Sequence, residues 1–239
     1  MNFDSIRKDV EPLFSHCEKN TRTYLSKIFN HASSYSLYES LDNELFVRHT
    51  ETDPKNTLIV CSCEPQEGRS TIALILAVLA AAFEPKKKVL LIDGDFYNGG
   101  LSQLLNTGEK TPGLHEYFTD KIAFKKCVHE TVLKNLSFAP MSENLTESPK
   151  LSQEKFKKFM EMASTEFDLV IIDSSSNNRS KSFMSMAKIV KNSLLVIKYN
   201  GPTRQQIQNL VDDLELGQAE IIGAVISQRK FDVPWIFYG

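Results

Sequence analysis

Six short apolar segments, separated by stretches long enough to form helices, constrain the fold of this chain more than any other feature. The segments are TLIVCS, KVLLIDGD, LSFAP, FDLVIID, SLLVIK and EIIGAVIS. Their apolar residues do not alternate with polar ones, so both faces of each strand are expected to be buried, as in a parallel sheet covered by helices on both sides. The sequence therefore predicts an α/β fold with a parallel sheet flanked by helices.

The segments between these strands favour helices at 70–83, 151–165, 182–191 and 203–216. The stretches TPGLHEYF (111–118) and PMSENLTESPK (140–150) are expected to be loops. Residues 1–50 are polar and poor in glycine and proline, with apolar residues at helical spacing in LFSHCEKNTRTYLSKIFNHA and SLYESLDNELFV. We therefore expect an N-terminal helical extension (1–50) followed by one α/β domain (51–239).

Composition narrows the classes of function. The net charge of −2 gives no support to a nucleic-acid partner. No stretch approaches the ~18 continuous apolar residues of a membrane helix, and the first residues lack the apolar core of a secretory signal. Four cysteines show no disulfide framework, and Cys61 and Cys63 are interpreted as strand-end packing because no second pair or nearby histidine completes a metal site. A cytoplasmic protein without membrane insertion is expected.

The segment EPQEGRST, between the first strand and the first helix of the domain, has the context of a phosphate-binding loop. Such loops point backbone N–H groups and a helix N-terminus at an anion. A lysine reaches the β and γ phosphates, and the following Ser or Thr binds Mg²⁺. Here arginine stands in the lysine position, and its guanidinium is longer, planar and forked. The candidate nucleotide-binding residues are Glu67, Gly68, Arg69, Ser70 and Thr71.

Two positions of this loop carry other residues where glycine would help. Cys63 stands at the first glycine position and Gln66 at a second. If the backbone is left-handed at Gln66, a residue with a side chain costs roughly 1–2 kcal/mol there. These departures weaken the expectation of tight nucleotide binding.

Three carboxylates follow apolar strands. Asp93 and Asp95 end the second strand segment, and Asp173 ends the fourth. Ligands of parallel sheets sit beyond the carboxyl ends of the strands, so we expect these residues along one rim with Ser62, Pro140 and the turn at 199–200. Strand-end aspartates can also simply cap the following turns. Three together beside the loop favour Mg²⁺ held by Ser70, Asp95 and Asp173, with Arg69, Asp93 and Asp95 as the catalytic candidates.

The ordered series of motifs resembles the cytoplasmic kinase domain of bacterial tyrosine kinases (BY-kinases). It runs CSCEPQEGRST, KKKVLLIDGDFYNGGL, TPGLHEYF, NLSFAPMSEN, EFDLVIIDSSS, SLLVIKYNGPTRQQIQNL and IIGAVISQRKFDVPWIFY. The family belongs to capsule and exopolysaccharide systems and is related to the ParA/MinD ATPases. The likeness spans about residues 38–236. It implies a P-loop NTPase-like fold of the deviant Walker A group, and Mg²⁺ with ATP or ADP as the cofactor if the site is competent.

The chain departs from the family pattern at several motif positions. In the loop, Pro65, Gly68 and Ser70 agree with the pattern, whereas Gln66 and Arg69 do not. The second motif has no arginine after its two aspartates, the third has SSS where the family has Thr-Pro-Pro, and Ser227 stands at the position of the base-contacting asparagine. Near Glu39 the two arginines used for ring assembly are missing, and Tyr238 stands alone instead of in a tyrosine cluster.

The resemblance leaves three functional hypotheses. The favoured one is a pseudokinase-type component of a polysaccharide synthesis or export system that acts through protein interaction, with weak or no phosphoryl transfer. The alternatives are an active ATP-dependent tyrosine kinase or ATPase that uses Arg69, and a ParA/MinD-like nucleotide switch. The implied partner is a membrane polysaccharide co-polymerase, or chain-length regulator, that recruits the protein to the inner face of the membrane; self-association is a further expectation. The tail segment WIFY (235–238) either packs on the domain or docks to this partner.

Overall fold

The computed structural model describes residues 36, 39, 57–96, 99–105, 107, 111–141, 152–175 and 181–228. Within these residues the chain forms a seven-stranded sheet in the order β3-β4-β2-β5-β1-β6-β7, and only β3 is antiparallel to its neighbour. The strands are β1 (Thr57–Ser62), β2 (Val89–Gly94), β3 (His129–Glu130), β4 (Leu136–Ala139), β5 (Leu169–Ser174), β6 (Asn192–Lys198) and β7 (Glu220–Ser227). The helices are α4 (Arg69–Phe83), α5 (Gly100–Leu105), α6 (Leu114–Phe118), α7 (Phe124–Cys127), α8 (Gln153–Glu166), α9 (Lys181–Ala187) and α10 (Arg204–Leu216).

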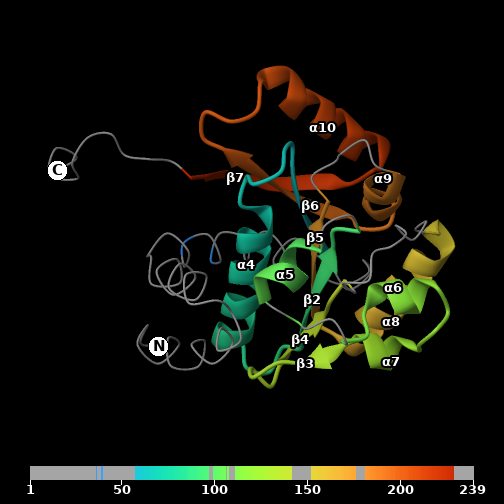
Figure 1. The fold of residues 1–239 in the computed structure, drawn as a ribbon. Coiled ribbons are helices and arrows are strands. Elements are labelled where there is room, and N and C mark those ends of the chain that lie inside the picture. The colour runs from blue at the N-terminus through green and yellow to red at the C-terminus, as the bar shows by residue number, and fades with distance from the viewer. Residues whose placement is uncertain are drawn as a thin grey trace, which may run out of the picture.

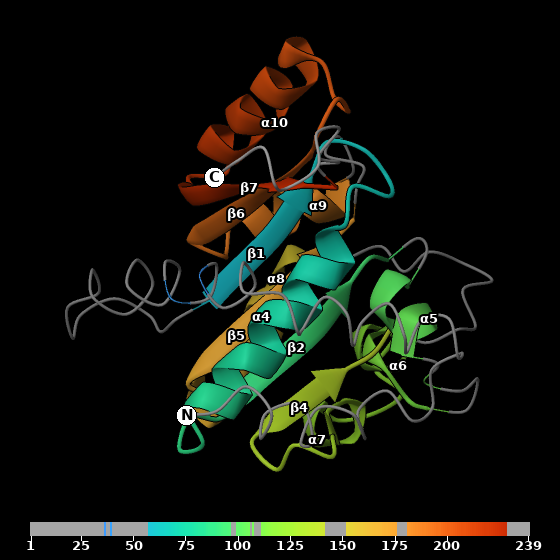
Figure 2. The same ribbon diagram turned by 90° about the vertical axis from the view of Figure 1, so that its left-hand side faces the viewer.

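Helices cover both faces of the sheet, as the apolar strands predict. Helix α4 packs along β1, β2 and β5 on one face, and α8 packs against β5 on the other (Figures 1 and 2). Successive strand residues point to opposite faces. Thus Leu58 and Val60 of β1 join the core under α4, whereas Ile59 and Cys61 join the core under α8. The predicted α/β fold with a mostly parallel, helix-flanked sheet is confirmed.

Helix α4 is buried along most of its length because its middle turns are uniformly apolar. The residues from Ala73 to Ala81 are all buried. Helices α8 and α10 are amphipathic instead, with Phe156, Phe159 and Leu210 on their buried sides. The central helix therefore sits inside the domain and carries the loop that precedes it on a rigid support.

The structure differs from the sequence-based prediction in its shorter elements. The stretch 111–118, expected to be a loop, contains helix α6. The backbone N–H of Gly113 donates to the Glu116 carboxylate at 2.8 Å, and Leu114 and Phe118 are buried one turn apart. Strand β3 and helices α5 and α7 were also not predicted, and α9 ends at Ala187, before the expected end at 191.

The predicted extension at 1–50 lies outside the described residues apart from Ser36 and Glu39, which are both helical. The tail from 229 onward, with Trp235 and Tyr238, also lies outside them. Within the part of the chain that the structure describes, no helix combines the length and the apolar character needed to cross a bilayer.

Candidate functional site at the carboxyl ends of the strands

The loop between β1 and α4 has the backbone shape of an anion-binding turn. Gln66 and Gly68 both adopt left-handed conformations, with φ of 61° and 90°. Gly68 is the N-cap of α4 and makes no side-chain cap to the first turn. A helix start without a side-chain cap of its own is the arrangement found where helix N-termini bind anions.

The Arg69 side chain turns away from solvent and bonds to the strand ends. Its Nε donates to Asp173 Oδ1 at 2.7 Å and its Nη2 donates to Asp95 Oδ2 at 3.3 Å. A longer bond of 3.4 Å joins Nη1 to the Ser62 hydroxyl. The side chain of Arg69 is 8% exposed and that of Asp173 is fully buried, so water screens this ion pair little. The guanidinium ties the first residue of α4 to β1, β5 and the end of β2.

The parallel register brings the strand-end carboxylates together as predicted. Asp93 of β2 lies directly opposite Asp173 of β5. Burial, together with the neighbouring charge of Asp173, raises the pKa of Asp93 to about 7. Bonds from Ser102 N and Oγ to Asp93 Oδ2, at 2.8 and 2.7 Å, oppose that shift without cancelling it. Asp93 is thus a carboxyl group that can hold a proton near neutral pH.

Burial also raises the pKa of Asp173, against the opposing effects of Arg69 and the Ser70 hydroxyl. These groups face one small space beside Gly100. A Cβ placed on Gly100 would lie 3.1 Å from Ser70 Oγ, 3.9 Å from Asp173 Oδ2 and 4.0 Å from Asp95 Oδ2. The three predicted metal ligands are therefore brought to one place, although two of them already bond to Arg69.

The other predicted loop residues have different surroundings. The Glu67 side chain is buried and accepts a bond from the backbone N–H of Glu64 at 3.1 Å. Thr71 is half-buried in the first turn of α4.

Cys61 and Cys63 are buried free thiols, and burial raises the pKa of Cys61 to about 12, which fits the interpretation as packing. Among the described residues, there is no group of three or more His, Cys, Asp or Glu side chains that could hold a metal ion.

Sequence reasoning singled out Ser227 as the position of the base-contacting asparagine, but it missed the contacts that close the loop from the side of β7. The Ser227 hydroxyl donates to the carbonyl of Glu67, and Gln228 Nε2 donates to the carbonyl of Gln66 at 2.7 Å. Gln206 of α10 bonds to the Glu64 carboxylate. Glutamine and serine in these places carry no motif, so no pattern in the chain marked these contacts. Ser102, the partner of Asp93, was missed for the same reason.

Several curated proteins are similar to this chain in sequence. No family model matches the chain. It is 22% identical over 235 residues to the putative tyrosine-protein kinase CapB of Staphylococcus aureus, covering 97% of this chain and 96% of that protein. It is 25% identical over 201 residues to the tyrosine-protein kinase etk of Escherichia coli K12, covering 82% of this chain. The chain spans nearly all of CapB but only 26% of etk.

Solved structures show the same architecture. The kinase domain of the Escherichia coli tyrosine kinase ETK superposes with a TM-score of 0.70 at 23% identity, covering 84% of this chain and 78% of that one. The septum site-determining protein MinD of Pyrococcus horikoshii, solved with Mg-ADP, superposes with a TM-score of 0.62 at 19% identity, covering 72% and 69%. At these identities the structural likeness shows the fold.

Proposed function

This chain belongs to the bacterial tyrosine kinase family with the MinD-related P-loop fold, and from that premise we propose that it acts mainly through protein interaction, with weak or no phosphoryl transfer. Its setting would be a capsule or exopolysaccharide synthesis or export system. The partner would be a membrane co-polymerase that recruits the protein to the inner face of the membrane. In this proposal the protein keeps the fold and the interaction surface of a kinase while its phosphate site is filled by its own side chain.

The buried bonds of Arg69 carry this proposal. A P-loop lysine works by reaching the β and γ phosphates, but the cation of this loop points to Asp173 and Asp95 instead. A nucleotide that recruited Arg69 would have to break a charge-assisted bond and leave Asp173 buried beside Asp93 without its cation. We expect this to cost about 3 kcal/mol, which is roughly a hundredfold in nucleotide affinity.

The direct test is calorimetric titration of the full chain with ADP and ATP in the presence of Mg²⁺, with the ETK kinase domain as the positive control. We expect no binding of micromolar strength by this chain. Autophosphorylation is followed in parallel by mass spectrometry at Tyr238. Micromolar binding of ATP·Mg²⁺ together with a phosphorylated Tyr238 would refute the proposal.

An active ATP-dependent tyrosine kinase or ATPase is the second candidate, and the cluster of carboxylates supports it. Ser70, Asp95 and Asp173 face one space and could hold the Mg²⁺ of a bound nucleotide. Asp93, with its pKa raised to about 7, is suited to take a proton from an attacking hydroxyl near neutral pH. This candidate predicts ATP turnover that is abolished in Asp93→Asn, and turnover no higher than that of buffer excludes it. A nucleotide switch of the MinD type would instead reveal itself as ATP-dependent dimerisation in light scattering.

A further inference from the structure

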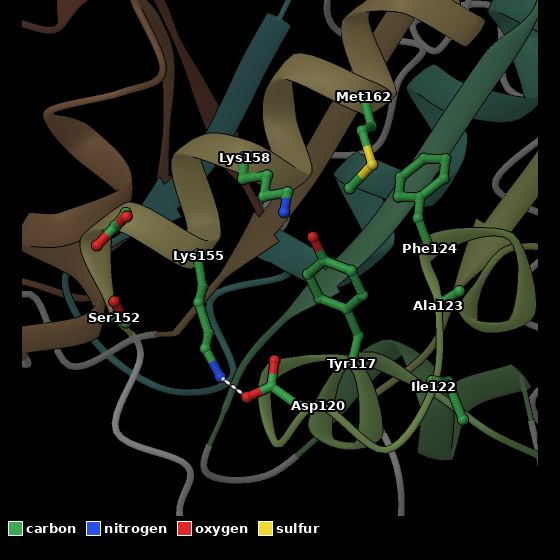
Figure 3. A pocket seen from close by; sticks show the side chains of 10 residues that line it. Tyr117, Asp120, Ile122, Ala123, Phe124, Ser152, Lys155, Lys158 and Met162 are labelled. Atoms are coloured by element: carbon green, nitrogen blue, oxygen red, sulfur yellow. Dashed lines mark hydrogen bonds and ion pairs between the residues drawn. The ribbon is translucent and has the colours of Figure 1, made fainter.

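A cavity lies beside the domain's aromatic cluster. It occupies about 490 Å³ between α6, α7 and α8 (Figure 3). Its walls include Tyr117, Ile122, Phe124, Lys155, Lys158 and Met162. None of these residues belongs to the site around Arg69. The volume falls within the range of small-molecule sites in proteins.

The aromatic side of this cavity is rigid. Tyr117 makes edge-to-face contacts with Phe118 and Phe159, with ring centroids 5.3 and 5.2 Å apart. Phe124 packs on the same Phe159 at 5.0 Å. Phe159 is completely buried, so these rings are fixed from behind. Rings held in this way form a preformed apolar wall, and little ordering entropy is lost when a ligand packs against it.

The two lysines of the cavity differ in their state of pairing. Lys155 Nζ donates to the carbonyl of Phe118 at 2.8 Å and pairs with Asp120 Oδ2 at 2.5 Å, so it has a counter-ion and links α8 to the turn after α6. Lys158 lies one turn further along α8, and within the described part of the chain it forms no ion pair or hydrogen bond. In Figure 3 its ammonium points toward the ring and hydroxyl of Tyr117.

The hydroxyl of Tyr117 is a second donor at the same point. Burial raises the pKa of this phenol above its ordinary value, with smaller contributions from Cys127 and Asp120. It therefore keeps its proton at neutral pH and can donate a hydrogen bond. One cation and one neutral O–H donor thus meet beside an apolar wall of Phe124 and Met162 (Figure 3).

We propose that this cavity binds a small aromatic anion, a carboxylate or a phosphate monoester. Its charged group would contact Lys158 and Tyr117, and its ring would lie on Phe124 and Met162. Acceptor atoms suit this point because the Lys158 ammonium only donates and the Tyr117 hydroxyl can donate, and negative charge suits it because Lys158 forms no ion pair among the described residues. Glu154 also lines the cavity, four residues before Lys158 on α8. Its carboxylate repels such a ligand, so removing its charge strengthens binding.

The experiment uses the full chain labelled with ¹⁵N and titrated separately with four probes. Benzoate and phenyl phosphate carry both ring and charge, benzyl alcohol carries only the ring, and acetate carries only the charge. We expect saturable shifts of residues in α6 and α8 with one or both aromatic anions, and none with the other two probes. Lys158→Gln should weaken binding about tenfold, and Tyr117→Phe severalfold. The control is Lys157→Gln, which changes an exposed neighbour outside this cavity and should change affinity less than about twofold.

The comparison of benzoate with phenyl phosphate identifies which anionic group is preferred, and either order supports the site. Glu154→Gln should increase affinity for both. The proposal is overturned if neither anion gives saturable shifts up to about 10 mM, if benzyl alcohol binds equally well, or if Lys157→Gln and Lys158→Gln have the same effect. Urea unfolding of each variant establishes that the substituted chains are folded.

Discussion

Arg69 Nε lies 2.7 Å from Asp173 Oδ1, and both side chains are buried. This ion pair joins the first residue of α4 to the end of β5, directly after the loop between β1 and α4. The cation that stands in the P-loop lysine position is paired with carboxylates of the protein itself. Stability and nucleotide affinity are therefore expected to respond in opposite directions when Arg69 is changed.

The substitution Arg69→Lys should increase affinity for ADP·Mg²⁺ by at least about tenfold. A lysine ammonium is compact and cannot reproduce the forked contacts to Asp173 and Asp95, so it is released more readily toward a phosphate. Calorimetry measures the change. Ser62→Ala serves as the control, since it removes the 3.4 Å bond to Nη1 and the 3.1 Å bond to the Glu64 carbonyl but leaves the ion pair intact. An Arg69→Lys protein with no more affinity than the parent would show that the arginine is not what limits binding.

Removing the guanidinium altogether should destabilise the fold. Arg69→Met leaves Asp173 buried without its cation and should lower the free energy of unfolding by about 3 kcal/mol. The double variant Arg69→Met with Asp173→Asn should recover a substantial part of that loss, because no uncompensated charge stays behind. Urea denaturation measures both proteins. Equal stabilities of the single and double variants would mean that the pair does not couple these elements.

The positions of the strand-end carboxylates could be predicted from the sequence, whereas the side-chain hydrogen bonds around the loop could not. The apolar strands predicted the parallel sheet, and the sheet necessarily places Asp93 and Asp173 at one rim. The groups to which Arg69 bonds depend on the directions of the side chains, and the spacing of residues in the sequence does not determine these directions. The contacts of Gln206 and Gln228 join residues far apart in the chain through common polar side chains, and the bond of Ser102 to Asp93 involves a residue type that marks no motif. Helix α6 was missed because its single turn is stabilised by Glu116 and by tertiary packing of Phe118 rather than by a long apolar period.

Gly68→Ala tests the backbone of the loop. The φ of 90° at this position is unfavourable for any residue with a Cβ, so the substitution should cost about 1–2 kcal/mol of stability. Gly223→Ala is the matched control. Gly223 lies in strand β7 without a positive φ, and an added Cβ would come no closer than 3.6 Å to Leu194. Its effect should stay within about 0.5 kcal/mol. A loop that tolerates alanine at 68 equally well cannot require the left-handed conformation.

Asp93 should make stability fall with rising pH. Its pKa is about 7 in the folded protein and near 3.8 when unperturbed. Between these values the folded state holds a proton that the unfolded state has lost. The favourable contribution is complete below about pH 4 and declines as the pH rises to 7, with a slope of at most about 1.4 kcal/mol per pH unit. Asp93→Asn should flatten this decline in urea midpoints measured between pH 4 and 8. An unchanged slope would assign the titration to another group.

The contacts of Ser227 and Gln228 link the end of strand β7 to the loop before α4. Both side chains donate hydrogen bonds to carbonyl oxygens of the loop, at Glu67 and Gln66, and both lie at the end of strand β7. A change in the shape of the loop at these two carbonyls would break both hydrogen bonds. The end of strand β7 is thus coupled to the conformation of the loop between β1 and α4.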